Sequence, residues 1–194
     1  IIYDDMGCVK TLPSKFVNEM KEKGISCIRF NPFRPMMAVI MNNRDHRKIT
    51  VIDGKIAYTG GFNLADEYIN EVELYGHWKD AGLRLTGSCV WNFTTMFLEM
   101  WDYITKEKED CFLFKPSFKE SVTEGKEHGF VQPYGDSPMD NENVGENVYL
   151  NLISHAKKAI TIFTPYLIIG SEMSTALINA VKTGVDVKIV VPGI

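Results

Sequence analysis

Apolar side chains recur at helical spacing over the longest regular stretch of the chain, residues 90–104. The apolar positions there are Val90, Phe93, Phe97, Met100, Trp101 and Ile104. Spacings of three and four residues line one face of a helix, so the stretch predicts an amphipathic helix that packs on a core. Further helices are predicted at residues 13–23, 146–158 and 171–183, and one more begins within residues 64–68.

Two apolar runs in the first half of the chain predict a β-hairpin. Residues 48–53 and 55–59 flank the pair Asp53-Gly54. Asp-Gly between apolar runs is a strong signal for a tight turn between antiparallel strands. Further strands are predicted at residues 1–3, 25–30, 81–85, 159–164 and 185–191.

The order of these elements predicts an α/β fold with a mixed β-sheet flanked by helices. Strand, helix and strand follow one another over residues 159–191, which is typical of a parallel βαβ unit. Residues 31–35 contain two prolines and predict a loop, and the charged residues 105–128 predict a flexible linker. The ending VDVKIVVPG weakly resembles the opening IIYDDMG, which indicates an internal repeat.

Composition narrows the function classes. Hydrophobic residues make up 45% of the 194 positions, enough for a packed core. The net charge of −4 makes nucleic acid an unfavoured partner. The four cysteines form no CxxC pair and no cluster with histidine, so we expect reduced thiols, no metal and no cofactor.

The two ends indicate a piece of a longer protein. The chain opens on IIYDD without an initiator methionine and closes on KIVVPGI. No apolar run approaches the roughly 18 residues that span a bilayer. Because the chain is expected to be a piece, the lack of a membrane anchor here says nothing of the parent protein.

Residues 44–63, RDHRKITVIDGKIAYTGGFN, collect the candidate chemistry. If the first hairpin strand extends back to His46, then His46 and Lys48 share a face about 7 Å apart. An imidazole can attack phosphorus and hold it covalently. An ammonium beside it can neutralise the charge that develops on phosphate oxygens. The pair therefore predicts attack on a phosphate ester.

The rest of this stretch supplies supporting groups. Asp53 completes the candidate catalytic set. Its side chain is expected on the other face of the strand from His46 and Lys48, and it lies at the turn, so a supporting role is favoured. Gly60 and Gly61 let backbone approach an anion closely. Asn63 can donate to a phosphoryl oxygen.

The joint pattern resembles the HxKxxxxDG motif of the phospholipase D superfamily, followed by its G-[GS]-x-N segment. Within the superfamily the chain looks most like bacterial cardiolipin synthase. The passages that carry the likeness are RDHRKITVIDGKIAYTGGFNLADEYIN, HWKDAGLRLTG, FLEMW and the C-terminal TPYLI and GVDVKIVVPG. Together they cover essentially the whole chain.

The resemblance implies a metal-free enzyme with two such motifs, one in each of two lobes. It implies that one phosphatidylglycerol donates a phosphatidyl group to another, giving cardiolipin and glycerol through a phosphohistidine. His46 would be the nucleophile or its acid/base counterpart, Lys48 would bind the phosphate, and Gly61 and Asn63 would help to hold it. Asp80 would orient the histidine, as carboxylates beside catalytic imidazoles do.

A second motif is absent from the sequence. The other histidines are His77, His128 and His155, and none begins an HxK with a later Asp-Gly. We expect the second motif beyond Ile194. Residues 1–128 are then the first lobe without its opening strands, and residues 129–194 are the opening βαβ part of the second lobe. That order is a permuted lobe, and the βαβ unit is predicted to fill the gap in the first-lobe sheet, within one chain or by exchange in a homodimer.

Three functions stay open on the sequence alone. The first is phosphatidyl transfer at the cytoplasmic membrane through the parent protein. The second is a nuclease or phosphodiesterase that works as a dimer, and the third is a non-catalytic lobe that binds lipid. Residues 36–41 form a dense apolar run that fits a core or an acyl-chain entrance, and Lys115 and Lys119 fit either solvent or anionic headgroups.

Overall fold

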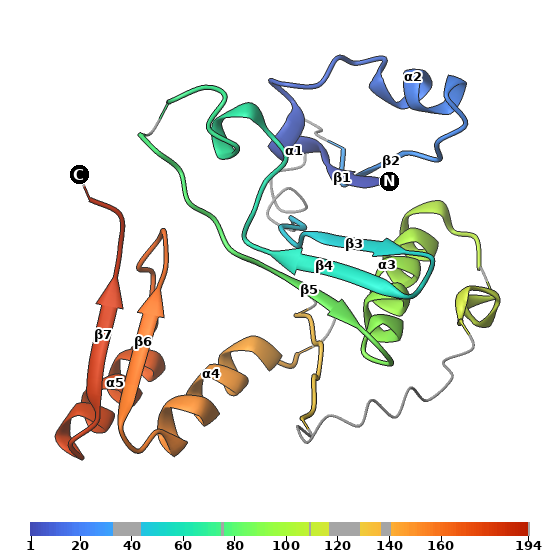
Figure 1. Ribbon diagram of the computed structural model, residues 1–194. Coiled ribbons are helices and arrows are strands. Elements are labelled where there is room, and N and C mark those ends of the chain that lie inside the picture. Colours follow the sequence, from blue (N-terminus) through green and yellow to red (C-terminus); the bar gives the residue numbers. More distant parts are fainter. Residues whose placement is uncertain (33–43, 75, 109, 117–128, 137–140, 194) are drawn as a thin grey trace. The chain divides into compact units, whose positions relative to one another are not determined.

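The computed structural model describes residues 1–32, 44–74, 76–108, 110–116, 129–136 and 141–193. The chain divides into two compact units, Ile1–Pro133 and Tyr134–Ile194. Helices and strands occur in both units, so the predicted α/β class is confirmed (Figure 1). The boundary lies a few residues beyond the predicted one at residue 128, and the assignment of the units to two lobes stays a prediction.

The first unit opens with two parallel strands, β1 (Ile2–Asp4) and β2 (Ile28–Phe30). Between them lie α1 (Asp5–Cys8) and α2 (Phe16–Glu22). Asp4 caps α1, because its side chain accepts hydrogen bonds from the amides of Met6 and Gly7. The strands and the helix predicted here are confirmed. β2 and α2 are shorter than the sequence indicated, and β1 is shifted by one residue.

A three-stranded antiparallel sheet follows, made of β3 (Ile49–Ile52), β4 (Ile56–Gly60) and β5 (Gly82–Thr86) in that order. The turn between β3 and β4 is closed by the Lys55 amide, which donates to the Ile52 carbonyl at 2.9 Å. Asp53 and Gly54 have φ values of 52° and 64°. Positive φ at both central residues is what a type I′ turn requires, so the predicted hairpin is confirmed.

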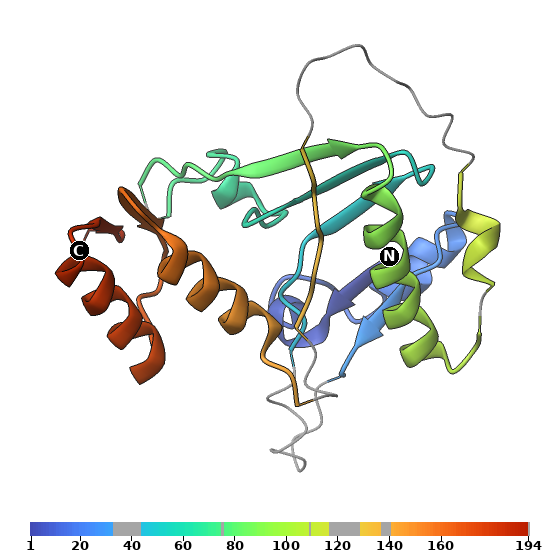
Figure 2. The ribbon, with the colours of Figure 1, turned by 90° about the horizontal axis from the view of Figure 1, so that it is seen from below.

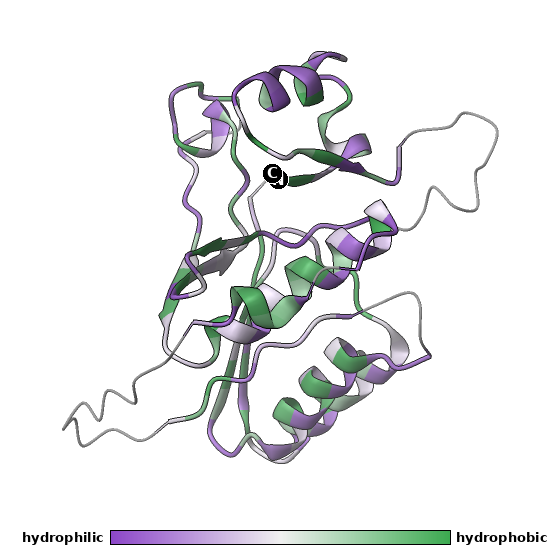
Figure 3. Cartoon of the chain, turned by 90° about the vertical axis from the view of Figure 1, so that its right-hand side faces the viewer, coloured by the Kyte–Doolittle hydropathy of each residue, from purple (hydrophilic) through white to green (hydrophobic). Residues whose placement is uncertain are grey.

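Helix α3 (Val90–Thr105) covers one face of this sheet (Figure 2). Figure 3 shows that the helix carries both hydrophobic and hydrophilic residues, as the predicted amphipathic helix requires. Val90 and Phe93 pack on Ala57 at the centre of the sheet. The partly buried residues around this core are Ile49, Val51, Leu85 and Cys89. Odd-numbered positions of β3, β4 and β5 therefore face the helix.

Two short 3-10 turns complete the first unit. Residues 64–68 hold only η2 (Asp66–Tyr68), so the prediction that a longer helix begins there is wrong. Asn70 has a φ of 62°, a left-handed conformation that is typical of a helix end. Within the charged segment 105–128 the structure shows η3 (Cys111–Phe114), whose carbonyl at Phe114 packs against Gly54. Residues 36–41 and Lys119, to which lipid contacts were assigned, lie outside the described residues.

The second unit is a parallel βαβ arrangement preceded by a helix. It contains α4 (Val144–His155), β6 (Ala159–Phe163), α5 (Ser171–Lys182) and β7 (Asp186–Val190). Strands β6 and β7 pair in parallel, and α4 and α5 pack on one face of the pair (Figure 2). The buried residues of this core are Ile153, Leu177, Ala180 and Val185. The predicted βαβ unit is confirmed.

Strands β6 and β7 form a sheet of their own within the described part of the chain. Filling of the first sheet by this βαβ unit, within one chain or by exchange between two copies, stays a prediction. Among the helices that the structure describes, none combines the length and the apolar character needed to cross a bilayer.

Candidate functional site

The candidate groups gather at one end of the three-stranded sheet, where β4 ends and β5 begins. The register pairs Ile49 with Thr59, and Gly60 with Gly82. Lys48, one residue before β3, therefore lies beside Gly60. Burial lowers the pKa of the Lys48 ammonium, while the charges of Asp45 and Asp80 act against that shift. Lys48 is thus close enough to Asp80 to sense its charge.

The segment that carries His46 is not a strand. β3 begins at Ile49, and residues 44–48 have no regular structure, so the parity argument that placed His46 and Lys48 on one face is wrong in its premise. The two residues are linked in another way, because the Lys48 ammonium donates to the His46 carbonyl at 2.9 Å. The His46 side chain is exposed, and it makes no hydrogen bond to any residue that the structure describes.

Ion pairs fix the backbone on both sides of His46. The Arg47 guanidinium donates to both carboxylate oxygens of Asp45, at 2.9 and 2.8 Å, and the Arg47 amide donates to the same carboxylate at 3.0 Å. Burial raises the pKa of Asp45, but the hydrogen bonds from Arg47 outweigh it and the net pKa lies below its ordinary value. The hydrogen bond to Asp45 also raises the pKa of Arg47.

The glycines of the GGFN segment let Phe62 fold back over the strand ends. A Cβ atom on Gly60 would lie 2.5 Å from the Ala81 carbonyl oxygen and 2.7 Å from Gly82 Cα. A Cβ atom on Gly82 would collide with the Phe62 ring. The Gly61 amide donates to the Ala81 carbonyl at 3.3 Å, so the chain is still paired with β5 at this point.

Asp80 is held in place from the other side. One carboxylate oxygen accepts from the Trp78 indole at 3.1 Å, and the other accepts from the Ala81 amide at 3.0 Å. Trp78 is in turn bound by Asn70 through two hydrogen bonds and stacks edge-on against Tyr68. Asp80 therefore lies fixed near Lys48 and Gly61. No hydrogen bond joins it to His46 within the described residues, so its orienting role stays a prediction.

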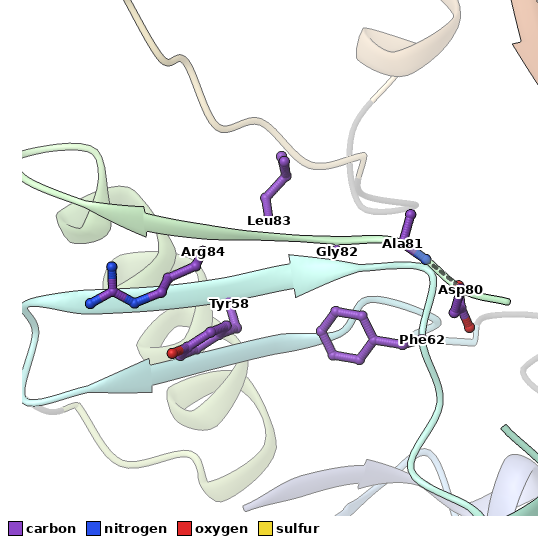
Figure 4. A pocket seen from close by; sticks show the side chains of 7 residues that line it. All are labelled: Tyr58, Phe62, Asp80, Ala81, Gly82, Leu83 and Arg84. Atoms are coloured by element: carbon purple, nitrogen blue, oxygen red, sulfur yellow. Dashed lines mark hydrogen bonds between the residues drawn. The ribbon is translucent and has the colours of Figure 1, made fainter. Parts of the chain in front are cut away.

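A shallow pocket of about 330 Å³ opens beside Asp80. Figure 4 shows the residues that line it: Tyr58, Phe62, Asp80, Ala81, Gly82, Leu83 and Arg84. Tyr58 and Arg84 are cross-strand partners on the even-numbered face of the sheet, away from α3. The sequence interpretation missed Phe62, Tyr58 and Arg84. Once the register is known, their even spacing from Gly60 and Gly82 would have indicated them.

Of two other members of the predicted set, one lies apart and one makes no hydrogen bond in the described part of the chain. Asp53 lies at the opposite end of β3 from Lys48, where it forms the turn, so the structure does not bring it together with His46. Asn63 follows Phe62, is half-buried and makes no hydrogen bond with the described residues. Within the residues that the structure covers, no three His, Cys, Asp or Glu side chains gather as metal ligands.

Known proteins have sequences similar to that of this chain. Residues 149–194 match the family model described as cardiolipin synthase, PLD-like domain. The chain is 34% identical, over 98% of its length, to a cardiolipin synthase of Alkalihalophilus pseudofirmus. It is 34% identical, over 99% of its length, to cardiolipin synthase 1 of Bacillus anthracis. The predicted relationship to the phospholipase D superfamily is confirmed.

The relatives are longer than this chain. It covers 37% of the Alkalihalophilus protein, 38% of the Bacillus protein, and 41% of a Streptococcus mutans uncharacterized protein to which it is 46% identical over its whole length. The chain thus spans about two fifths of the curated relatives that it matches.

Among the histidines in the described parts of the chain, neither His77 nor His155 is an imidazole of the same kind as His46. His77 is exposed, and His155 ends α4 with its Nδ1 2.9 Å from the Asn151 carbonyl. His128 lies outside the described residues. Of the histidines that the structure describes, only His46 has a lysine held against its own carbonyl.

Proposed function

We propose that the protein to which this chain belongs transfers a phosphatidyl group between two phosphatidylglycerol molecules, giving cardiolipin and glycerol. The observation that carries the proposal is the placement of exposed His46 next to Lys48, with Asp80 and Gly61 at the same end of the sheet. The printed names of the relatives support the lipid class. We place the reaction at the cytoplasmic membrane surface, where such a substrate lies.

His46 attacks the phosphorus of the first phosphatidylglycerol. A P–N bond forms, the P–O bond to the headgroup glycerol breaks, and the glycerol leaves with a proton. The hydroxyl of a second phosphatidylglycerol then attacks phosphorus, breaks the P–N bond and returns its proton to the group that had protonated the glycerol. In the alternative assignment His46 gives and takes these protons while a second imidazole is the nucleophile.

Lys48 balances charge in both steps. An ammonium has three donors, and one of them is used on the His46 carbonyl, so two remain for phosphoryl oxygens. Asp80 lies near enough to strengthen the cationic form of Lys48. The proton donor for the leaving group is assigned to the rest of the protein, because a single imidazole cannot be bonded to phosphorus and protonate glycerol at once.

The test uses the full-length protein and vesicles of phosphatidylglycerol labelled in the headgroup glycerol and in the acyl chains. The proposal requires release of labelled glycerol with formation of labelled cardiolipin. A quench in denaturant near neutral pH should trap acyl label on a histidine, since acid would cleave the P–N bond and strong base would hydrolyse the acyl esters. His46→Asn should abolish both signals.

His155→Asn is the matched control, because it removes an imidazole that is exposed on another unit. It should leave both signals unchanged. Label on a different histidine, with turnover still lost in His46→Asn, supports the acid/base assignment. Cleavage of DNA without lipid turnover would refute the proposal and favour the dimeric nuclease. Lipid binding without turnover would favour a non-catalytic lobe.

A further inference from the structure

A carboxylate far from His46 in sequence touches the segment that carries it. Asp4 ends β1, 42 positions before His46. One of its oxygens accepts from the Arg44 guanidinium at 3.1 Å, and the other accepts from the Asp45 amide at 3.1 Å. The first oxygen also accepts from the Met6 and Gly7 amides at the start of α1. Asp4 therefore joins β1, α1 and residues 44–45.

The contacts are mostly shielded from water. The side chains of Asp4, Arg44 and Asp45 are 13%, 22% and 18% exposed. Hydrogen bonds to a charged acceptor are shorter and stronger than neutral ones, and water competes poorly for them at this burial. The same Arg44 atom donates to the Asn31 carbonyl at 3.0 Å, which ties the segment to the residue after β2.

The fixation continues to the far side of His46. Asp45, whose amide is held by Asp4, is itself the carboxylate that binds Arg47 in a bidentate pair. Arg47 also senses the charge of Glu99 on α3. The charged side chains of residues 44, 45 and 47 thus form hydrogen bonds with other residues of this unit. The His46 side chain between them is exposed.

We propose that Asp4 is a positioning residue for His46: its carboxylate fixes residues 44 and 45 and so the direction in which the imidazole is presented. The expected fall in kcat rests on the proposed function. The expected change in the position of His46 rests on the hydrogen bonds alone. Asp4→Asn keeps the size of the side chain, removes its charge and replaces one acceptor by a donor that faces the Arg44 guanidinium or the Asp45 amide.

The kinetic test compares Asp4→Asn with the wild type in the full-length protein. Misplacement of a reacting group by about an ångström lowers a rate by roughly 100-fold, so we expect phosphohistidine formation and kcat to fall 10- to 100-fold. The KM for phosphatidylglycerol should change less than threefold, because Gly61 and Asp80 are held by β5 and Trp78. A changed KM with unchanged kcat overturns the proposal.

Asp110→Asn is the matched control. Asp110 is a carboxylate of the same unit that caps η3 through the Phe112 amide at 3.1 Å, so its loss has a structural effect without touching residues 44–47. It should leave kcat and KM within twofold of the wild type. An equal fall of kcat in Asp110→Asn and Asp4→Asn assigns the effect to general destabilisation and overturns the proposal.

A second readout does not need the reaction. In protein labelled with carbon-13 at histidine Cε1, the His46 signal is assigned by its loss in His46→Asn. Asp4→Asn should shift or broaden that signal, leave the His155 signal in place and speed hydrogen exchange at the Asp45 amide at least tenfold. Unchanged His46 signal and exchange overturn the proposal, whatever the protein catalyses. If the wild type forms no cardiolipin but these changes are seen, the proposed function fails and the positioning role stands.

Arg44→Gln serves where Asp4→Asn does not fold, as judged by circular dichroism. It removes the guanidinium that joins Asp4 to the Asn31 carbonyl and should give the same His46 shift and the same kcat loss. Absence of both changes in folded Arg44→Gln overturns the proposal.

Discussion

Gly60 and Gly61 of the GGFN segment should respond differently to replacement by alanine. We expect Gly60→Ala to destabilise the fold and Gly61→Ala to be tolerated. A Cβ atom on Gly60 would lie 2.5 Å from the Ala81 carbonyl oxygen, 2.7 Å from Gly82 Cα and 2.9 Å from the Phe62 ring. The first two neighbours are backbone and cannot rotate away. A Cβ atom on Gly61 has one neighbour, the Asp80 carboxylate at 3.2 Å, which can move by a few tenths of an ångström.

The magnitude follows from these contacts. Forcing a methyl group into a packed site costs about 1–3 kcal/mol. Separating β4 from β5 also weakens the hydrogen bond from the Gly61 amide to the Ala81 carbonyl, worth roughly 1 kcal/mol. Replacing glycine by alanine returns about 0.4–1 kcal/mol because the unfolded chain loses freedom. Gly60→Ala should therefore lower the free energy of unfolding by about 2 kcal/mol, and Gly61→Ala should change it by less than about 0.5 kcal/mol.

Urea unfolding followed by tryptophan fluorescence measures this difference. All three tryptophans, Trp78, Trp91 and Trp101, lie in the unit that contains the sheet. The signal therefore reports on that unit. If Gly60→Ala is as stable as Gly61→Ala, the close approach of β4 and β5 at this point is not what requires glycine, and the steric reasoning is refuted.

Three further predictions concern the turn between β3 and β4, the loss of stability at acid pH, and the hydrophobic core of the second unit. Asp53→Asn should leave phosphohistidine formation within twofold of the wild type, because asparagine tolerates φ of 52° and Asp53 acts as a turn residue; a loss like that of His46→Asn would show a catalytic role. The pKa of Asp45 is below its ordinary value, so its stabilisation is complete above the unfolded pKa of about 4 and is lost as pH falls through the folded value. Asp45→Asn should therefore reduce the fall in Tm between pH 5 and pH 3, and a fall as steep as in the wild type contradicts the ion pair. Leu177→Ala should cost about 2–4 kcal/mol in thermal unfolding followed by circular dichroism, since it leaves a cavity against Ile153 and Ala180, whereas exposed Ile178→Ala should cost less than about 1 kcal/mol.

Local signals were sufficient for most of the fold. The Asp53-Gly54 turn, helix α3 and the β6–α5–β7 unit follow from residues within a few positions of one another, and each is confirmed. Helix α3 was predictable because Val90 and Phe93 begin an apolar stripe that the sheet needs for its core. The helix predicted to begin at residues 64–68 is only the single turn η2, because the chain turns left-handed at Asn70.

Distant contacts in the candidate site were beyond the sequence. Asp4 and Arg44 are 40 positions apart, and nothing in their spacing indicates that they meet. The packing of Phe62 on Gly82 likewise depends on the register of β4 with β5. The sequence could mark His46 and Lys48 as a pair, but it placed them on a strand that begins only at Ile49.

The contacts of residues 44–48 explain how an exposed imidazole can still have a defined direction. In the sequence, residues 44–48 are five polar residues in a row. In the structure, Arg44 donates hydrogen bonds to the Asp4 carboxylate and the Asn31 carbonyl. Arg47 donates two hydrogen bonds to the Asp45 carboxylate. Ordering the backbone costs about 1–2 kcal/mol of conformational entropy per residue. Charge-assisted hydrogen bonds that do not involve the His46 side chain offset this cost. The imidazole makes no hydrogen bond to the residues that the structure describes, and its backbone is held in place. The nucleophile proposed here needs both properties, free bonding capacity and a fixed position.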